Sequence, residues 1–589
     1  MTNCQRPEYP RPDFSREQWI NLNGTWEFEF DPGCSGKERN LFEAGKFNKE
    51  IIVPFCMESS LSGINYKDFM PAIWYRRTFT LPEDWKNKNV ILNIGACDFF
   101  TRIYVNGKEA FTHKGGYTPI RCNITKLLVS GKNIITIEVQ DDIRTGLQPA
   151  GKQSDKFYSY GCSYTRTTGI WQTVWLEAVP STYIENFKLE SDIDNARLII
   201  SVKIAGDNRP ATISADISAH GKSIATASAK IANNIAIFTL DLPEQILWSP
   251  KNPFLYDIKL KLESASGIDI VNSYFGMRKI HIENRKLYLN NEEFYMRLVL
   301  DQGFYPDGIY TARSDDDLRK DIELSLAAGF NGARLHQKVF EPRFLYWADK
   351  LGYIVWEEAG SWKCHFDNPL GVANFIDEWL EVLQRDYNHP SIIGWCPLNE
   401  TSRPHQTGSL PKWLHYHLYQ INKTINPNRL AIDTSGYIHY QNVPSDLYDV
   451  HNYHTPETLE ADLSPLKTGN WQQAFKNCPQ DVPYDGTNPY FVSEFGGIWW
   501  NPKSTGNDWG YGDRPKSEQE FLDRYYKTFK VLFDNPGICG WCYTQLYDIE
   551  QEANGIYYYD RTVKFSADIQ KQLTKITQGN IKTLTLTKK

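Results

Sequence analysis

The second half of the chain constrains the fold most, because short apolar runs alternate there with segments that carry helix signals. Ser314 begins one helix as a capping-box residue and Pro342 lies in the first turn of the next, while Gly329 and Gly352 end them. Eight apolar runs are predicted to be strands, at residues 294–300, 331–335, 353–357, 392–398, 430–433, 447–451, 490–493 and 538–543. Eight strand–helix units in about 300 residues predict a (β/α)8 barrel over residues 281–589, with its chemistry at the carboxyl ends of the strands.

The residues before the barrel alternate in polarity with the period of a β-strand. Residues 26–30 and 133–139 show this pattern, and Asn106 followed by Gly107 predicts a tight hairpin turn. After residue 182 aromatic residues become rare, and short alternating runs rich in Ile, Ala, Ser and Lys continue to about residue 280. We therefore expect two β-sandwiches, one over residues 1–182 and a smaller immunoglobulin-like one over 183–280.

Composition excludes several classes of protein. The 64 basic and 71 acidic residues, a net charge of −7, are interspersed, so no basic stripe points to nucleic acid. No apolar run approaches the roughly 18 residues of a membrane-spanning helix. The 11 cysteines are odd in number and scattered, which favours free thiols in a reducing compartment over a disulfide framework. We expect a cytoplasmic protein, or a periplasmic one if a signal peptide has been removed, that binds neither nucleic acid nor membrane.

Two glutamates follow predicted strands of the barrel. Glu400 comes just after the fourth strand and Glu494 directly after the seventh. A carboxylate is costly at such a place unless it faces a cavity or has a partner, and two carboxylates across one barrel mouth are what glycosidic bond cleavage requires. The alternative is that either glutamate only forms an ion pair inside the barrel, with Arg334 or Arg297. Two glutamates at one mouth favour the catalytic interpretation.

Two motifs surround the glutamates, at residues 388–395 with 399–400 and at residues 493–496. They resemble the acid/base signature and the nucleophile strand of glycoside hydrolase family 2, the group of β-galactosidases, β-glucuronidases and β-mannosidases. Further matching segments lie at residues 21–26, 74–77, 105–107, 169–171, 275–278, 331–334 and 347–352. The resemblance implies a sugar-binding-like jelly-roll sandwich, an immunoglobulin-like sandwich and a (β/α)8 barrel, in that order.

The resemblance also implies a retaining double displacement. Glu494 would be the nucleophile and Glu400 the acid/base, with Asn399 bonded to the sugar 2-hydroxyl. Tyr453 would orient the nucleophile, although a packed aromatic residue is the alternative, and Arg334 would keep Glu494 ionised. We further expect exo action on a small-molecule or oligosaccharide substrate and allow for a homo-oligomer, because family members are often dimers or tetramers.

Substrate-binding candidates lie at other strand ends. They are Asp301 and Gln302 after the first strand, His336 and Gln337 after the second, Trp541 as a pocket floor, Trp499 as a stacking platform, and Arg166 and Lys338 as cations for an anionic sugar. Glucuronidases of the family carry an Asn-X-Lys pair after the last strand, and this chain has Asn554 there without the lysine. The sequence therefore favours a β-galactoside-type substrate. A β-glucuronide, β-galacturonide or arabinoside, or a non-catalytic carbohydrate-binding role, stays an alternative.

No cofactor is expected. His415 and His417 are two residues apart on a predicted helix, which is poor spacing for metal ligands, although Mg²⁺ or Na⁺ is not excluded because some family members bind these ions. Cys539 and Cys542 imitate a redox motif, but they lie within a predicted strand rather than at a helix start. We therefore predict no redox role for them.

Overall fold

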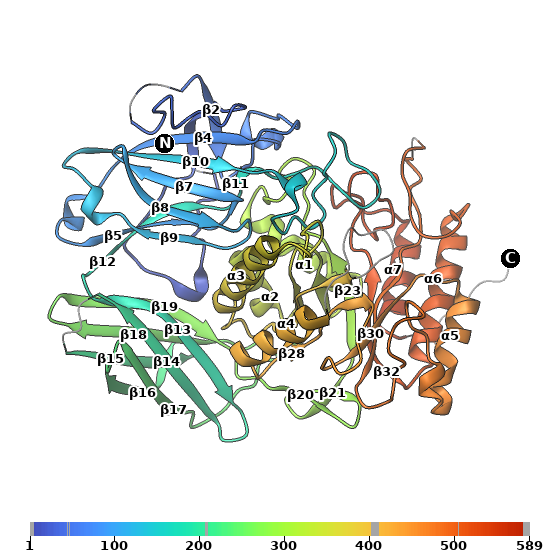
Figure 1. The fold of residues 1–589 in the computed structure, drawn as a ribbon. Helices are drawn as coiled ribbons and strands as arrows, with labels where there is room; N and C mark the ends of the chain where they lie inside the picture. The colour runs from blue at the N-terminus through green and yellow to red at the C-terminus, as the bar shows by residue number, and fades with distance from the viewer. Residues whose placement is uncertain are drawn as a thin grey trace.

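The computed structural model describes residues 5–43, 45, 47–206, 210–401, 412–504 and 506–580. Figure 1 shows two β-sandwiches stacked beside a barrel of strands and helices, in chain order from blue to red. This architecture confirms the predicted fold class. The predicted boundaries after residues 182 and 280 stay predictions. Within the described ranges, no helix is long and apolar enough to cross a membrane.

The N-terminal sandwich packs a six-stranded sheet, in the order β3-β2-β4-β10-β7-β8, against a four-stranded sheet in the order β1-β12-β5-β9. The strands are β1 Trp19–Asn21, β2 Gly24–Phe30, β3 Lys49–Val53, β4 Ala72–Thr80, β5 Asn89–Ile94, β7 Phe100–Val105, β8 Lys108–Lys114, β9 Ile120–Asn123, β10 Lys132–Gln140 and β12 Val174–Val179, with a small pair of β6 Cys97–Asp98 and β11 Gly169–Ile170. Trp26, Tyr75 and Ile137 are among its buried core. Asn106 and Gly107 both have positive φ between β7 and β8, which is the hairpin turn predicted from the sequence.

The second sandwich joins a sheet in the order β13-β14-β17 to one in the order β16-β15-β18-β19. Its strands are β13 Tyr183–Asp192, β14 Arg197–Ala205, β15 Ala211–Ala219, β16 Lys222–Lys230, β17 Ile235–Asp241, β18 Tyr256–Ser264 and β19 Gly267–Phe275. Buried and exposed residues alternate along β18, which is the pattern of a strand with one face in a core. A small sheet of β20 Ile280–Glu283, β21 Lys286–Leu289 and β22 Glu292–Phe294 leads into the barrel.

The barrel sheet has eight parallel strands in the order β28-β26-β25-β24-β23-β32-β31-β30. They are β23 Met296–Asp301, β24 Gly332–Leu335, β25 Ile354–Glu358, β26 Ile392–Cys396, β28 Leu430–Ala431, β30 Tyr448–Asn452, β31 Tyr490–Gly496 and β32 Ile538–Thr544. Asp446, just before β30, joins the two edge strands, since its amide donates to the carbonyl of Ala431 at 2.9 Å. Each predicted strand therefore has its counterpart, with ends shifted by a few residues.

Helices cover the outside of this sheet (Figure 1). They are α1 Asp315–Ala327, α2 Pro342–Leu351, α3 Pro369–Arg385, α4 Lys412–Ile425, α5 Pro456–Thr468, α6 Glu518–Phe533 and α7 Ala567–Thr577; 3-10 turns lie at η1 Pro12–Phe14, η2 Ser60–Ser62, η3 Glu83–Trp85, η4 Thr125–Leu127, η5 Ile143–Thr145 and η6 Trp471–Gln473. The predicted capping box of Ser314 is present on α1, where it pairs with Asp317. Pro342 begins α2, and Gly352 ends it with a left-handed φ of 71°.

The fourth barrel strand differs from the prediction at its carboxyl end. β26 stops at Cys396, before Pro397, which has no amide hydrogen to donate to a sheet. Asn399 and Glu400 belong to a separate short strand, β27 Asn399–Thr401, which pairs with β29 Ser435–Tyr437 over the mouth of the barrel. The Cys539 and Cys542 thiols are free and buried within β32, as expected for structural cysteines.

A loop of the N-terminal sandwich lies along a loop of the barrel. The amide of Ala150 donates to the carbonyl of Trp362 at 3.2 Å, and the amide of Gly151 donates to the carbonyl of Gly360 at 3.1 Å. Gly151 is required there because its φ is +54° and an added Cβ would lie 2.1 Å from the carbonyl oxygen of Gln337. The sandwich is thus in backbone contact with the rim of the barrel mouth.

Candidate active site

Glu400 on β27 and Glu494 on β31 face each other at the carboxyl ends of the barrel strands. One oxygen of each carboxylate and a ring nitrogen of His451 all lie within 4.8 Å of one another. Both side chains are only 6% exposed. Glu400 has a φ of 49°, in the left-handed region, where strained residues of active sites are often found. The two glutamates chosen from the sequence therefore lie in one site.

Cations and hydroxyl groups surround the carboxylate of Glu494. Arg334 donates from Nη1 to Oε1 at 2.9 Å, and the Tyr453 hydroxyl donates to Oε2 at 2.6 Å. Burial by itself would raise the pKa of Glu494, but the charges of His451 and Arg334 hold this pKa well below its usual value. Glu494 is therefore ionised at neutral pH, as a nucleophile must be.

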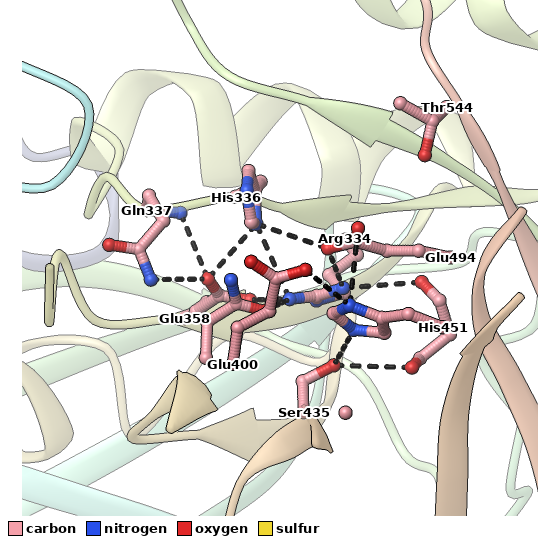
Figure 2. A network of polar contacts seen from close by, with 12 residues as sticks. Arg334, His336, Gln337, Glu358, Glu400, Ser435, His451, Glu494 and Thr544 are labelled. Carbon is pink, nitrogen blue, oxygen red and sulfur yellow. Dashed lines mark hydrogen bonds and ion pairs between the residues drawn. The ribbon is translucent and has the colours of Figure 1, made fainter. Parts of the chain in front are cut away.

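Arg334 is fixed from several sides. It is fully buried on β24, and its Nε donates to Oε2 of Glu358 at 2.7 Å while its Nη2 donates to Oδ1 of Asn399 at 2.5 Å. Burial would raise the pKa of Glu358, yet Arg334 and His336 lower it to about 2. Arg334 and Glu494 form an ion pair, which was the alternative considered from the sequence. The paired carboxylate of Glu494 also faces Glu400 (Figure 2).

His451 links the two glutamates. Its Nδ1 lies 2.9 Å from Oε1 of Glu400 and 3.3 Å from Oε2 of Glu494, while its Nε2 lies 3.0 Å from the Ser435 hydroxyl. Ser435 in turn donates to Asp449 at 2.9 Å. The sequence analysis gave His451 no catalytic role. The missed signal was spacing, since His451 lies two residues before Tyr453 and so shares its face of an extended chain.

The same trio bears on metal binding. Among the residues that the structure describes, one group of three His, Cys, Asp or Glu side chains lies close enough together to hold a metal ion, and it consists of Glu400, His451 and Glu494. Nδ1 of His451 contacts both carboxylates, and Arg334 and Tyr453 occupy the oxygens of Glu494. We therefore interpret the trio as a carboxylate pair with a positioning histidine.

Three more predicted residues adjoin this network. Asn399 accepts from Arg334. His336 has its Nδ1 3.1 Å from Glu358 and 3.9 Å from Glu494, and Gln337 donates to Glu358 at 3.0 Å (Figure 2). Burial lowers the pKa of His336, which favours its neutral form. Asn399, Tyr453, Arg334, His336 and Gln337 are therefore all brought together around the glutamates.

The structure contradicts two predicted sugar contacts. Asp301 lies on the outer face of β23, where it accepts from Tyr547, because Leu298 and Leu300 occupy the inward positions of that strand. Burial raises the pKa of Asp301 to about 6. Trp541 is fully buried between β32 and α6, with its ring centroid 4.9 Å from that of Phe529. Neither residue can form the floor or wall of a sugar pocket.

Other predicted contacts do not touch either glutamate. Gln302 donates to Gln545 at 2.7 Å, and the Trp499 ring lies 5.5 Å from the guanidinium of Arg514. Arg166 donates to the backbone carbonyls of Ser154, Lys156 and Lys67, so its charge is used within the sandwich loops. Lys338 is buried and donates to the carbonyls of Gly303 and Tyr310. Roles in substrate binding for Gln302, Trp499 and Arg166 stay predictions.

Several residues of the pocket were not found from the sequence. The ammonium of Lys152 lies 3.7 Å from the centre of the Trp362 ring, and Tyr511 stacks on Tyr453 at 3.7 Å. Glu552 is buried and accepts from the Tyr164 hydroxyl and from Asn554 at 2.9 Å. Lys152 comes from the sandwich, and no pattern in the sequence links its loop to the barrel.

Known proteins resemble this chain over most of its length. A putative β-glucuronidase of Formosa agariphila is 29% identical over 56% of this chain and 39% of its own length, and a β-galactosidase of Thermoanaerobacter pseudethanolicus is 27% identical over 58% and 46%. A β-glucuronidase of Paenibacillus borealis is 24% identical over 67% of this chain and 69% of its own. The chain thus matches about two fifths to two thirds of these relatives' lengths.

Solved structures share the fold. The β-glucuronidase from Ruminococcus gnavus in complex with D-glucuronic acid superposes with a TM-score of 0.77 at 18% identity, over 97% of this chain and 100% of that one. Models of glycosyl hydrolases family 2 match residues 20–180 as the sugar binding domain, residues 182–278 under the family name alone, and residues 280–578 as the TIM barrel domain. The chain therefore belongs to glycosyl hydrolases family 2.

Proposed function

We propose that the chain is a retaining exo-β-glycosidase in which Glu494 is the nucleophile and Glu400 the acid/base. The observation that carries this proposal is the approach of the two carboxylates, which have oxygens within 4.8 Å of each other. Retaining enzymes hold their two carboxyl groups about 5–5.5 Å apart, whereas inverting enzymes leave about 6.5–9.5 Å for a water molecule. The spacing supports direct attack by one carboxylate on the sugar.

The reaction then runs in two steps. The ionised Glu494 attacks the anomeric carbon while Glu400 gives its proton to the leaving oxygen, which forms a glycosyl-enzyme ester and frees the aglycone. In the second step Glu400 takes a proton from water, the resulting hydroxide attacks the anomeric carbon, and Glu494 departs as a carboxylate. The guanidinium of Arg334 beside Glu494 stabilises its charge before the first step and after the second.

We infer exo action from the contact between the two domains beside the active site. The sandwich loop that carries Ala150 and Gly151 is hydrogen-bonded along the barrel loop at Gly360 and Trp362. A site flanked by a second domain favours the end of a sugar chain over its middle. Release of terminal monosaccharide alone from an oligomer supports the proposal, and internal cleavage contradicts it.

The released sugar is of the galactoside or uronide type. The sequence favoured a β-galactoside, and Asn554, where the family's glucuronidases carry an Asn-X-Lys pair, donates here to the carboxylate of Glu552. The relatives named as β-glucuronidases favour a uronide, and one relative is a β-galactosidase. The comparisons thus give the galactoside no advantage. An arabinosidase and a non-catalytic sugar-binding protein are the remaining candidates for the test below.

The test compares the native chain with Glu494→Gln on aryl β-galactoside, β-glucuronide, β-galacturonide, β-mannoside and arabinoside. We expect turnover by the native chain and a loss of at least about 10³-fold in the variant, because the covalent nucleophile is removed. Glu457→Gln is the matched control, since the Glu457 side chain is 74% exposed on α5. Equal rates for the native chain and Glu494→Gln would refute the role of Glu494.

A further inference from the structure

Two lysines near the active site, Lys152 and Lys363, form no ion pair with a carboxylate of the described residues. Lys152 is 5% exposed, and its ammonium lies 3.7 Å from the centre of the Trp362 ring. Lys363 donates to the hydroxyl of Ser163 at 2.9 Å. Across the described ranges of the chain, no carboxylate oxygen lies within 4 Å of either ammonium. A nearly buried cation without a counter-ion is costly, so this corner of the pocket is suited to an anion.

The backbone of the sandwich loop fixes the position of Lys152. Its carbonyl accepts from the amide of Tyr164 at 2.7 Å, and the amide of Ser154 donates to the carbonyl of Tyr164 at 2.7 Å. The preceding Gly151 is hydrogen-bonded to the barrel loop, as described above. Lys152 is therefore held by its own domain on one side and by the barrel on the other.

The indole of Trp362 connects Lys152 with the catalytic residues. Its ring N–H donates to the carbonyl of Asn399 at 3.2 Å, and its amide donates to the side chain of Gln337 at 2.9 Å. Asn399 directly precedes Glu400. The ammonium of Lys152 thus lies against an aromatic ring whose N–H contacts the acid/base segment, and its charge also acts on His336 of the active-site network.

Lys152 influences the ionisation of two neighbouring groups, Lys363 and Glu552. Burial, with a smaller effect of the Lys152 charge, lowers the pKa of Lys363 to about 8, and Asp155 opposes this shift. After burial, the charge of Lys152 has the largest effect on the pKa of Glu552, which it lowers, and Glu552 is also hydrogen-bonded to Tyr164 and Asn554. Burial raises the pKa of Glu552. The site therefore contains two lysine ammonium groups, Lys152 and Lys363, and one carboxyl group, Glu552, close together.

We propose that Lys152, with Lys363 beside it, forms an anion subsite that binds the C6 carboxylate of a terminal β-linked uronic acid. This inference rests on the proposed function and names its substrate class. Family glucuronidases place their lysine after the last barrel strand, where this chain has none, so the cation here comes from the sandwich and from the loop after β25. Arg166 and Lys338, the cations chosen from the sequence, are both bonded to backbone carbonyls, and the subsite proposed here does not include them.

The kinetic test uses substrates that differ only at C6. The 4-nitrophenyl β-glucuronide is paired with the β-glucoside, and the β-galacturonide with the β-galactoside. We expect Lys152→Met to lower kcat/KM for the preferred uronide about 10- to 100-fold more than for its neutral counterpart, because one charged hydrogen bond is lost. Lys363→Met should show the same selective loss to a smaller extent. Lys156→Met is the matched control, since Lys156 is exposed on the same loop and also lies near an aromatic ring.

The outcomes separate this inference from the proposed function. Native turnover of neutral glycosides only, or equal losses on both members of a pair, would overturn the anion subsite and leave the glycosidase intact. Calorimetric titration of Glu494→Gln with free glucuronic and galacturonic acid needs neither turnover nor a lysine variant. Binding of one acid at least tenfold tighter than its neutral hexose, weakened by added salt, supports the subsite even for a chain without turnover. Equal binding of acid and hexose refutes it.

Discussion

Tyr453 offers the sharpest test of the two-step reaction. Its hydroxyl donates to Oε2 of Glu494 at 2.6 Å and also lies 2.9 Å from the Thr544 hydroxyl. The ring stacks on Tyr511 with centroids 3.7 Å apart and planes 6° apart, so Tyr453→Phe removes the hydroxyl and leaves the ring in place. The change therefore isolates one hydrogen bond to the nucleophile.

The size of the effect follows from that bond. A hydrogen bond to a charged group contributes about 1.5–3 kcal/mol, which corresponds to roughly 10- to 150-fold in rate. The bond weakens when Glu494 becomes an ester and strengthens when the carboxylate departs, so its loss slows the second step most. We expect Tyr453→Phe to lower kcat by about 10- to 100-fold and to accumulate the glycosyl-enzyme.

Stopped-flow release of dinitrophenolate measures this directly. Native chain and variant are compared on a dinitrophenyl glycoside, and the variant should show a burst of one equivalent followed by slow turnover. Tyr511→Phe is the control, because its ring remains stacked and its hydroxyl makes no hydrogen bond to Glu494. A variant without a burst, or a loss no larger than that of the control, would refute the reasoning.

The pH dependence gives a second readout of the same change. Burial would raise the pKa of Glu494, but the charges of His451 and Arg334 hold it well below its usual value. The hydrogen bond from Tyr453 adds to this lowering, because it favours the ionised carboxylate. Removing the hydroxyl therefore raises this pKa. Activity that needs ionised Glu494 is lost as pH falls through the pKa, so the acid limb of kcat/KM should move to higher pH.

Two further predictions concern the acid/base and the domain contact. Glu400→Ala should lower kcat/KM about 10²- to 10⁴-fold for a phenyl glycoside but less than tenfold for a dinitrophenyl glycoside, whose leaving group needs no proton; equal losses would exclude Glu400 as the acid. Gly151→Ala should lower kcat/KM more than tenfold and reduce Tm, because its Cβ would lie 2.1 Å from the Gln337 carbonyl oxygen. Gly161→Ala is its control, with a φ of +51° and open space at the Cβ, and similar behaviour of the two variants would contradict the claim.

Sequence patterns predicted the barrel well, for physical reasons. Strands of a parallel sheet are buried on both faces and read as apolar runs, and helix ends carry caps such as Ser314, so the order of elements is visible. The two glutamates stood out because carboxylates rarely follow apolar strands without a function. Their convergence then follows from the barrel itself, since all its strands end at one mouth.

The direction of side chains was harder to predict. In a run buried on both faces, apolarity does not tell which residues point into the barrel and which point to the helices. For this reason Asp301 and Trp541 were placed in the pocket, although both lie on the helix side. His336 and Gln337 were predicted to lie near the barrel mouth. In the structure both contact Glu358, which belongs to the network around the two glutamates.

Residues from another domain were not predictable at all. Lys152 lies almost 250 positions before Glu400 in the chain, and neither period nor motif connects them. Only the backbone pairing of Ala150 and Gly151 with the barrel loop brings the lysine to the site. Contacts of this kind depend on how two finished domains fit together, which local patterns do not describe.

The crossing of the sandwich loop onto the barrel has a consequence for how such enzymes can be divided or recombined. A barrel expressed alone from residue 281 would keep both glutamates and lose Lys152, so it would keep its chemistry while losing a determinant of its choice of sugar. Conversely, grafting a foreign sandwich onto this barrel would be a route to new selectivity without altering a single catalytic group.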